Sequence, residues 1–180
     1  MKDLKDFNIP FIGLKLGSHL FEYKIDNTFF ETFNFDEYFN AAISVKVDFV
    51  KKATLMEMDM HVEGTVNVPC DTTNIAFDQE IDGMLHLVVK FGPEYNDDNE
   101  DILILPHEVY QLNIAQHIYE LIVLSVPSKR IHPKVIDGTM QSKALDKLNE
   151  LQITTEKTVE DTEIDPRWDK LKNLITEKKT

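Results

Sequence analysis

Residue types that carry chemistry are few in this chain, and the most reactive of them is its single cysteine, Cys70. A zinc site takes about four ligands, and its thiolates usually come in pairs. His61 and His86 lie on neighbouring predicted strands, but both occupy polar positions far apart in sequence. A nucleophilic thiol needs a base and an oxyanion hole, and no local signature of either is present. We therefore predict no metal site and no cofactor, and interpret Cys70 as a small apolar group at a strand end.

The acidic run after residue 96 has part of the spacing of a calcium loop. Asp97, Asn99 and Asp101 occupy the first, third and fifth positions of an EF-hand loop, and Glu108 falls at the twelfth. The sixth position is Ile102, where such a loop needs glycine for its sharp turn. We therefore predict a solvated acidic loop at this place rather than a calcium site.

One basic cluster follows the end of a predicted helix and consists of Lys129, Arg130, His132 and Lys134. Cations at a helix C-terminus are favoured by the helix macrodipole, so a structural role is the first interpretation. Contact with RNA phosphates is the alternative, because local charge can act against the field of the whole protein. That alternative adds four lysines near the end of the chain, Lys170, Lys172, Lys178 and Lys179.

Signatures of catalysis are missing from the rest of the sequence. We find no glycine-rich phosphate loop, no pair of catalytic carboxylates at a defined spacing and no Ser-His-Asp signature. The sequence therefore predicts a protein that is not an enzyme. A hydrolase hidden in a barrel-like sheet is a third alternative, which a closed cavity lined by polar groups would support.

The chain carries 32 acidic and 19 basic side chains, a formal net charge of −13 at pH 7. Such a field repels phosphate backbones and attracts basic partners, which argues against non-specific nucleic-acid binding by the whole chain. Residues 41–100 hold twelve acidic and four basic residues, a net of −8, whereas residues 101–180 hold thirteen and eleven, a net of −2. A basic protein segment is thus the predicted partner of the first region, although negative charge also serves solubility.

Composition and the N-terminal residues predict a soluble cytoplasmic protein. A hydrophobic share of 42% is ordinary for a globular protein. A single cysteine allows no intramolecular disulfide, which suits a reducing compartment. The N-terminal residues show no signal peptide, and no apolar run approaches the roughly 20 residues of a membrane span.

Alternating apolar and polar residues dominate the middle of the chain, at residues 43–49, 56–62, 66–70 and 81–91. Turn-like "KKAT", "EGT" and "CDTTN" separate these segments, so we predict an antiparallel meander with one buried face. Whether this sheet closes into a barrel stays open. Two strands, "IPFIGLKL" and "SHLFEYKID", are predicted on either side of Gly17.

Helical periodicity appears in two places around this sheet. In the aromatic segment 26–39, Asp26 and Asp36 are each predicted to cap a short helix. A long helix packed on the sheet is predicted to begin at Asn113, with Gln116 completing a capping box, and to end before Pro127. The predicted fold is therefore α+β.

We predict a single α+β domain at residues 1–140 and a helical C-terminal tail at 141–180, with a polar linker at 152–164. The tail is expected to hold a brief amphipathic helix, "SKALDKLNEL", before this linker. A last helix after it is predicted from Asp165 as N-cap and Pro166 at the first helical position. This last helix carries Arg167 and the only tryptophan, Trp168, whose apolar stripe must cover either the protein's own core or a partner.

Several segments, taken in order, resemble the YceD family, the large ribosomal RNA subunit accumulation proteins. They are "FIGLKLGSHLFEYKID", the "FF" of the aromatic segment, "VEGTVNVPCDTTN", "YELIVLSVPSKRIHP" and "DPRWDKLKNL". The resemblance implies a bacterial or plastid cytoplasmic protein that large-subunit ribosomal RNA needs in order to accumulate. It also implies a gene beside that of a small basic zinc-ribbon protein of the large subunit, and no established enzymatic activity.

The chain departs from this family at its thiols. Many relatives have Cys-x-x-Cys at the meander turn, but here Cys70 is followed by Asp71, Thr72 and Thr73. Many also have cysteines after the long helix, where "SKRIHPKVIDGTMQSK" has none. A metal-binding role proposed for such relatives therefore does not transfer to this chain.

The combined prediction is a non-enzymatic assembly factor that escorts a basic large-subunit ribosomal protein or a preribosomal particle. The polar face of the meander and an acidic segment are expected to meet Lys/Arg-rich sequence. The residues predicted to contact the partner are Glu94, Asp97, Asp98, Glu100, Asp101, Arg167 and Trp168. Direct RNA binding through the basic loop 129–134 and the tail lysines is the alternative.

Overall fold

The computed structural model describes residues 4–99 and 101–151. The chain separates into two units, residues 1–142 and 143–180. The described part of the second unit is the helix α4 (Lys143–Leu151), at the place predicted for a brief amphipathic helix. The predicted boundary at residue 140 stays a prediction. The linker 152–164, Arg167, Trp168, the tail lysines and Glu100 lie outside the described residues.

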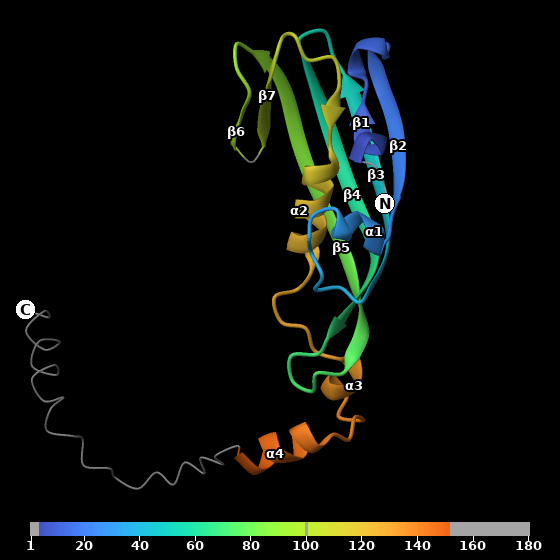
Figure 1. The fold of residues 1–180 in the computed structure, drawn as a ribbon, viewed down its shortest axis with the longest axis vertical. Coiled ribbons are helices and arrows are strands. Elements are labelled where there is room, and N and C mark those ends of the chain that lie inside the picture. Colours follow the sequence, from blue (N-terminus) through green and yellow to red (C-terminus); the bar gives the residue numbers. More distant parts are fainter. Residues whose placement is uncertain (1–3, 100, 152–180) are drawn as a thin grey trace, which may run out of the picture. The chain divides into compact units, whose positions relative to one another are not determined.

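A six-stranded sheet forms the frame of the first unit (Figure 1). Along the sheet its strands follow in the order β2-β3-β4-β5-β7-β6, and β2 to β5 are antiparallel neighbours, as the alternation predicts. The sheet does not close into a barrel, since β2 and β6 stand at its two edges. The strands are β2 (Gly17–Ile25), β3 (Asn40–Lys51), β4 (Leu55–Pro69), β5 (Ala76–Gly92), β6 (Asn96–Asn99) and β7 (Ile102–Pro106).

The prediction of a purely antiparallel sheet is wrong at one edge, because β7 pairs with β5 in parallel. The acidic segment predicted as a loop forms β6, which turns back into β7 and pairs with it antiparallel. This places β7 between two strands, and its Leu103 and Leu105 are buried. All four residues of β6 are exposed and polar, so no alternation marked it as a strand.

The strand that was predicted to break at "EGT" instead runs unbroken through that segment as β4. Gly64 permits this continuity, because its backbone adopts a φ of +156°. A Cβ at this position would lie 2.3 Å from the carbonyl oxygen of Ala42 on β3. The glycine therefore marks a close approach of two strands, rather than a turn between them.

Helices and an N-terminal segment cover one face of the sheet and complete the core. The helix α2 (Ala115–Ser125) lies against β5 and β4, and α1 (Asn27–Glu31) lies against β3. Gly83 lets α2 approach closely, since a Cβ there would overlap the hydroxyl of Ser125. Apolar side chains of β3, β4 and β5 fill the core below, including Val45, Val47, Phe49, Met56, Met58, Met60, Val62, Leu87 and Val89.

Two helix predictions need correction. Asp26 caps α1 by accepting from the backbone N–H of Thr28 at 3.2 Å, as predicted, but no helix follows Asp36. The chain leaves α1 through Asn34, at a φ of +54°, and runs on without helix into β3. Because Asn34 takes the left-handed conformation, the aromatic segment bends back onto α1, where Phe35 donates its N–H to the carbonyl of Phe30.

The helix α2 has 11 residues, so the prediction of a long helix is not confirmed. It begins after Ile114 rather than at Asn113, and the predicted capping box does not form. Asn113 contacts both segments: its side-chain oxygen accepts from the N–H of Ala115, the first residue of α2, at 3.0 Å, and its amide donates to the carbonyl of Leu4 at 2.7 Å. Gln116 donates to Glu120, one turn further along the helix.

The predicted first strand, "IPFIGLKL", is also wrong. The segment forms two 3₁₀ turns, η1 (Leu4–Phe7) and η2 (Phe11–Gly13), around the two-residue strand β1 (Asn8–Ile9). That strand pairs with β8 (Leu112–Asn113) in a small second sheet. Pro10 follows β1 directly, and because proline has no N–H it cannot extend the ladder.

Candidate protein-binding surface

The face of the sheet that points away from α2 is open and polar. Its side chains alternate with the buried ones along β3, β4 and β5, and the strand register sets them in rows. One row places Asp48 opposite Asp59, and Asp59 opposite His86. Like charges directly opposite one another destabilise a sheet unless a cation lies between them. A basic ligand over this row would relieve the repulsion.

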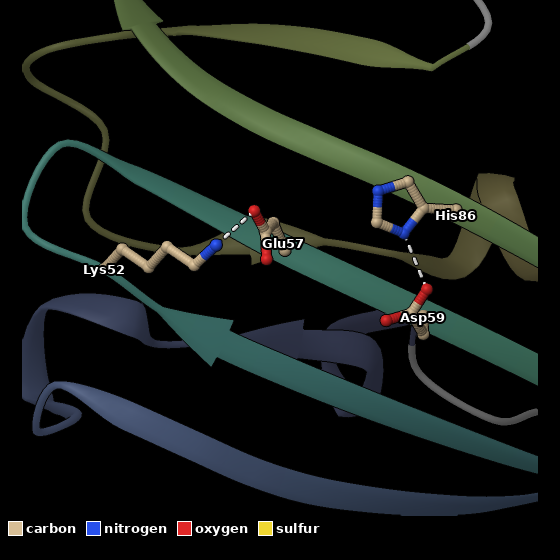
Figure 2. A network of polar contacts seen from close by, with 4 residues as sticks. All are labelled: Lys52, Glu57, Asp59 and His86. Carbon is tan, nitrogen blue, oxygen red and sulfur yellow. Dashed lines mark hydrogen bonds and ion pairs between the residues drawn. The ribbon is translucent and has the colours of Figure 1, made fainter.

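A histidine pairs with a carboxylate on this face (Figure 2). Nδ1 of His86 lies 2.6 Å from a carboxylate oxygen of Asp59. This hydrogen bond raises the pKa of His86, against a smaller opposing effect of burial, and the nearby charges of Asp59, Glu57 and Asp101 raise it further. Figure 2 also shows Lys52 paired with Glu57 at the end of the same face. A second imidazole, His61, approaches Asp82 at 3.3 Å.

Five exposed carboxylates continue along the face on β4 and β5, and we call them the acidic stripe. They are Asp59, Glu63, Asp78, Glu80 and Asp82. Within the described ranges, none of the five forms an ion pair with a lysine or an arginine. Their polar partners are imidazoles and, for Asp78, the amide of Asn67 at 2.6 Å. The stripe is therefore a strip of carboxylates whose ion-pair partners, among the described residues, are imidazoles alone.

The spacing of the acidic stripe matches that of an extended peptide. Asp78, Glu80 and Asp82 alternate along β5, so their Cα atoms follow one another at about 7 Å. Two shallow hollows of about 430 and 530 Å³ lie on this face, one beside Glu80 and the other beside His86. An extended chain with a basic residue at every second position has the same repeat as these three carboxylates.

The acidic residues at 94–101, which the sequence analysis predicted to contact a partner, lie in different surroundings. Asp101 lies close enough to His86 to raise its pKa, and so adjoins the open face. Asp97 lines a pocket beside α2, on the covered side of the sheet. Glu94 and Asp98 are exposed, and Glu100 is outside the described residues. Asp97 and Asp101 thus adjoin opposite faces of the sheet, and contact of the predicted residues with a partner stays a prediction. The acidic stripe was foreseen only as the polar face of the meander.

The basic loop is bound to the body of the protein. The guanidinium of Arg130 lies 3.5 Å from Asp71 and 3.7 Å from Glu37. The N–H of Arg130 also donates to Asp71, at 2.6 Å. His132 stacks near Phe77, whereas Lys129 and Lys134 are exposed. These contacts support a structural role for Arg130 and His132, and RNA contact by the cluster stays a prediction.

Cys70 lies under this loop and is buried, with 2% of its surface exposed. Burial raises the pKa of its thiol, but several hydrogen bonds outweigh that effect and lower the pKa to about 7. The donors are the backbone N–H of His132, at 3.3 Å from Sγ, and groups of Thr72 and Thr73. The thiol thus joins the basic loop to the turn between β4 and β5.

We expect the thiolate of Cys70 to form near pH 7, and its ultraviolet absorbance to titrate there. Because the folded pKa lies below the ordinary value, the thiolate stabilises the fold fully above about pH 9, and that contribution is lost as pH falls through 7. Relative to Cys70→Ser, the free energy of unfolding should therefore rise by about 1–2 kcal/mol between pH 7 and 9. Titration only near the ordinary value would contradict this.

Comparison with known proteins decides the family. The model of the family described as large ribosomal RNA subunit accumulation protein YceD matches residues 58–175, more than half of the chain. The chain belongs to the YceD family. Membership connects it with the accumulation of large-subunit ribosomal RNA. The match spans the acidic stripe and α2, whereas β2 and β3 lie before it.

No curated protein and no solved structure matches the chain. In the described part of this YceD protein, no helix has the length and apolar character needed to cross a membrane. Within the same residues, no group of three or more His, Cys, Asp and Glu side chains is placed to hold a metal ion.

Proposed function

We propose that this YceD protein acts without catalysis, in the cytoplasm, by binding a basic segment of a large-subunit ribosomal protein or of a preribosomal particle. The acidic stripe is the binding surface. Bound there, the lysines and arginines of the partner are shielded from premature contact with RNA, and the partner is delivered for assembly of the large subunit. The observation that carries this proposal is the row of exposed carboxylates on one sheet face, none of which forms an ion pair with a lysine or an arginine within the described residues.

The electrostatics of the stripe suit a temporary escort. Exposed ion pairs contribute about 0.2–1 kcal/mol each, so several together give useful affinity while each remains replaceable. Ribosomal RNA carries a far denser negative charge than a single sheet face, and it therefore competes effectively for the same basic segment. Complementary charge also raises the rate of association of the two proteins, and salt reduces this effect by screening.

Direct RNA binding is less well supported by the same structure. A strip of exposed carboxylates repels phosphate. Arg130 and His132, the central residues of the basic loop, already contact Asp71, Glu37, Cys70 and Phe77.

The proposal is tested by mixing the purified protein with the small basic ribosomal protein whose gene commonly neighbours those of the family. We expect a complex at micromolar concentration that weakens as salt rises, measured by calorimetry at two ionic strengths. Cells that lack the protein should show less free and assembled large subunit on a sucrose gradient. A normal gradient would contradict the assembly role, and the absence of a salt-sensitive complex would contradict the escort.

A further inference from the structure

A second acidic feature lies on the other side of the sheet, in a pocket of about 310 Å³ between β6 and α2. Leu87 and Leu103 form its buried floor. Polar groups from both elements line its walls: Tyr95, Asp97, Asn99, Asn113, Gln116, His117 and Glu120. The pocket therefore combines an apolar base with converging polar groups, which is typical of binding sites.

The hydrogen bonds of the pocket leave it rich in acceptors. The hydroxyl of Tyr95 already donates to Asp97 at 3.1 Å. The amide of Gln116 donates to Glu120 at 2.6 Å, and that of Asn113 donates to the N-terminal segment. Two carboxylates keep further lone pairs, and no lysine or arginine belongs to the lining. A ligand that fits must therefore bring several donors.

His117 supplies the observation that points to a particular kind of ligand. Its Nδ1 is buried and has no hydrogen-bond partner in the described structure. Burial lowers the pKa of this histidine, although the charges of Glu120 and Asp97 act in the opposite direction. The ring is thus neutral near pH 7, and a neutral imidazole has one nitrogen that accepts a hydrogen bond. The ring therefore adds no positive charge to the pocket that would repel a cationic ligand.

We propose that this pocket binds the side chain of one arginine from a basic protein segment. A guanidinium has five donors in a planar fork, which suits the two carboxylates of the lining. Its positive charge balances Asp97 and Glu120, and its methylene stem packs on Leu87 and Leu103. The inference rests on the proposed function, because it assigns an anchor for the same class of partner at a site separate from the acidic stripe.

The test uses the peptide acetyl-Gly-Arg-Gly-amide, which is too short to need the stripe, and its counterpart with neutral citrulline in place of arginine. Binding to the full chain is followed by NMR, at the ring of His117 and the backbone of Tyr95. We expect saturable shifts with the arginine peptide and at least tenfold weaker binding of the citrulline peptide. The double variant Asp97→Asn/Glu120→Gln should weaken the arginine peptide by about tenfold or more, since two charge-assisted bonds are lost.

Each outcome separates this inference from the proposed function. Neutralising Asp78, Glu80 and Asp82 on the acidic stripe should leave binding of the short peptide unchanged. If the arginine peptide gives no saturable shift at His117, or if citrulline binds equally well, the pocket inference is overturned while the stripe can still bind a long basic segment. Binding of spermidine as tight as that of the arginine peptide would also overturn it, since it would identify a site for small polyamines.

Discussion

Replacing Gly64 by alanine is expected to destabilise the protein by roughly 3–5 kcal/mol, the largest effect of any single substitution considered. A Cβ at this position meets the backbone of β3 at 2.3 Å from the oxygen of Ala42 and 2.7 Å from Cα of Ile43. Neither is the flexible end of a side chain, so the strands themselves must separate. The φ of +156° adds backbone strain for any residue with a side chain.

The measurement is urea unfolding followed by circular dichroism. A domain of this size has about 5–15 kcal/mol of stability in total, so the urea midpoint should fall by roughly a fifth or more. Gly13→Ala is the matched control, because a Cβ there meets nothing within 4 Å. Its stability should stay equal or rise by up to about 1 kcal/mol, since alanine restricts the unfolded chain. Equal midpoints for both variants would show that the close approach of β3 and β4 is not rigid.

Neutralising the acidic stripe in the triple variant Asp78→Asn/Glu80→Gln/Asp82→Asn should weaken binding of the basic ribosomal protein about 30-fold at low salt. This magnitude follows from roughly 0.7 kcal/mol for each of three exposed ion pairs. The fold itself should be unaffected, since all three side chains are exposed. The difference from the wild type should shrink as salt rises, because screening removes the same interactions in both proteins.

The control for this prediction makes the same change in net charge elsewhere. Glu31, Asp36 and Glu108 are exposed and lie outside the acidic stripe. Neutralising all three should weaken binding far less, because this change lowers the net charge of the protein but removes no ion pair with the partner. Calorimetry on both triple variants, at two ionic strengths, makes the comparison. Equal losses would mean that net charge, and not the stripe, attracts the partner.

The parts of the fold that follow from local alternation were predictable from sequence. Val45, Val47 and Phe49 on β3, and Met56, Met58 and Met60 on β4, are buried as their period-two spacing predicts. The capping role of Asp26 was predictable for the same reason, because a cap depends on residues two or three positions away. The polar face of the sheet follows directly from this alternation.

Features that depend on pairing between distant segments were not predictable in this way. The parallel pairing of β7 with β5 cannot be predicted from "ILILP", because this apolar sequence suits a parallel or an antiparallel strand equally well. Asn113 was expected to cap a helix, and its side-chain oxygen does accept from Ala115 at the start of α2, but its amide also bonds to Leu4 and Asn8, over 100 residues earlier. The pocket beside His117 likewise exists only because β6, a strand without any apolar residue, lies next to α2.

The pairing of β1 with β8 has a consequence for how the protein is made. Phe7 accepts a hydrogen bond from Ile114, and Ile118 and Ile122 of α2 are fully buried in the core. During synthesis the apolar face of β4 is finished roughly 50 residues before these covering segments emerge, which takes about 3–10 s at 5–20 residues per second. Throughout that interval each nascent chain presents an uncovered sheet of methionines and valines, a target for the chaperones that meet new polypeptides at the ribosome.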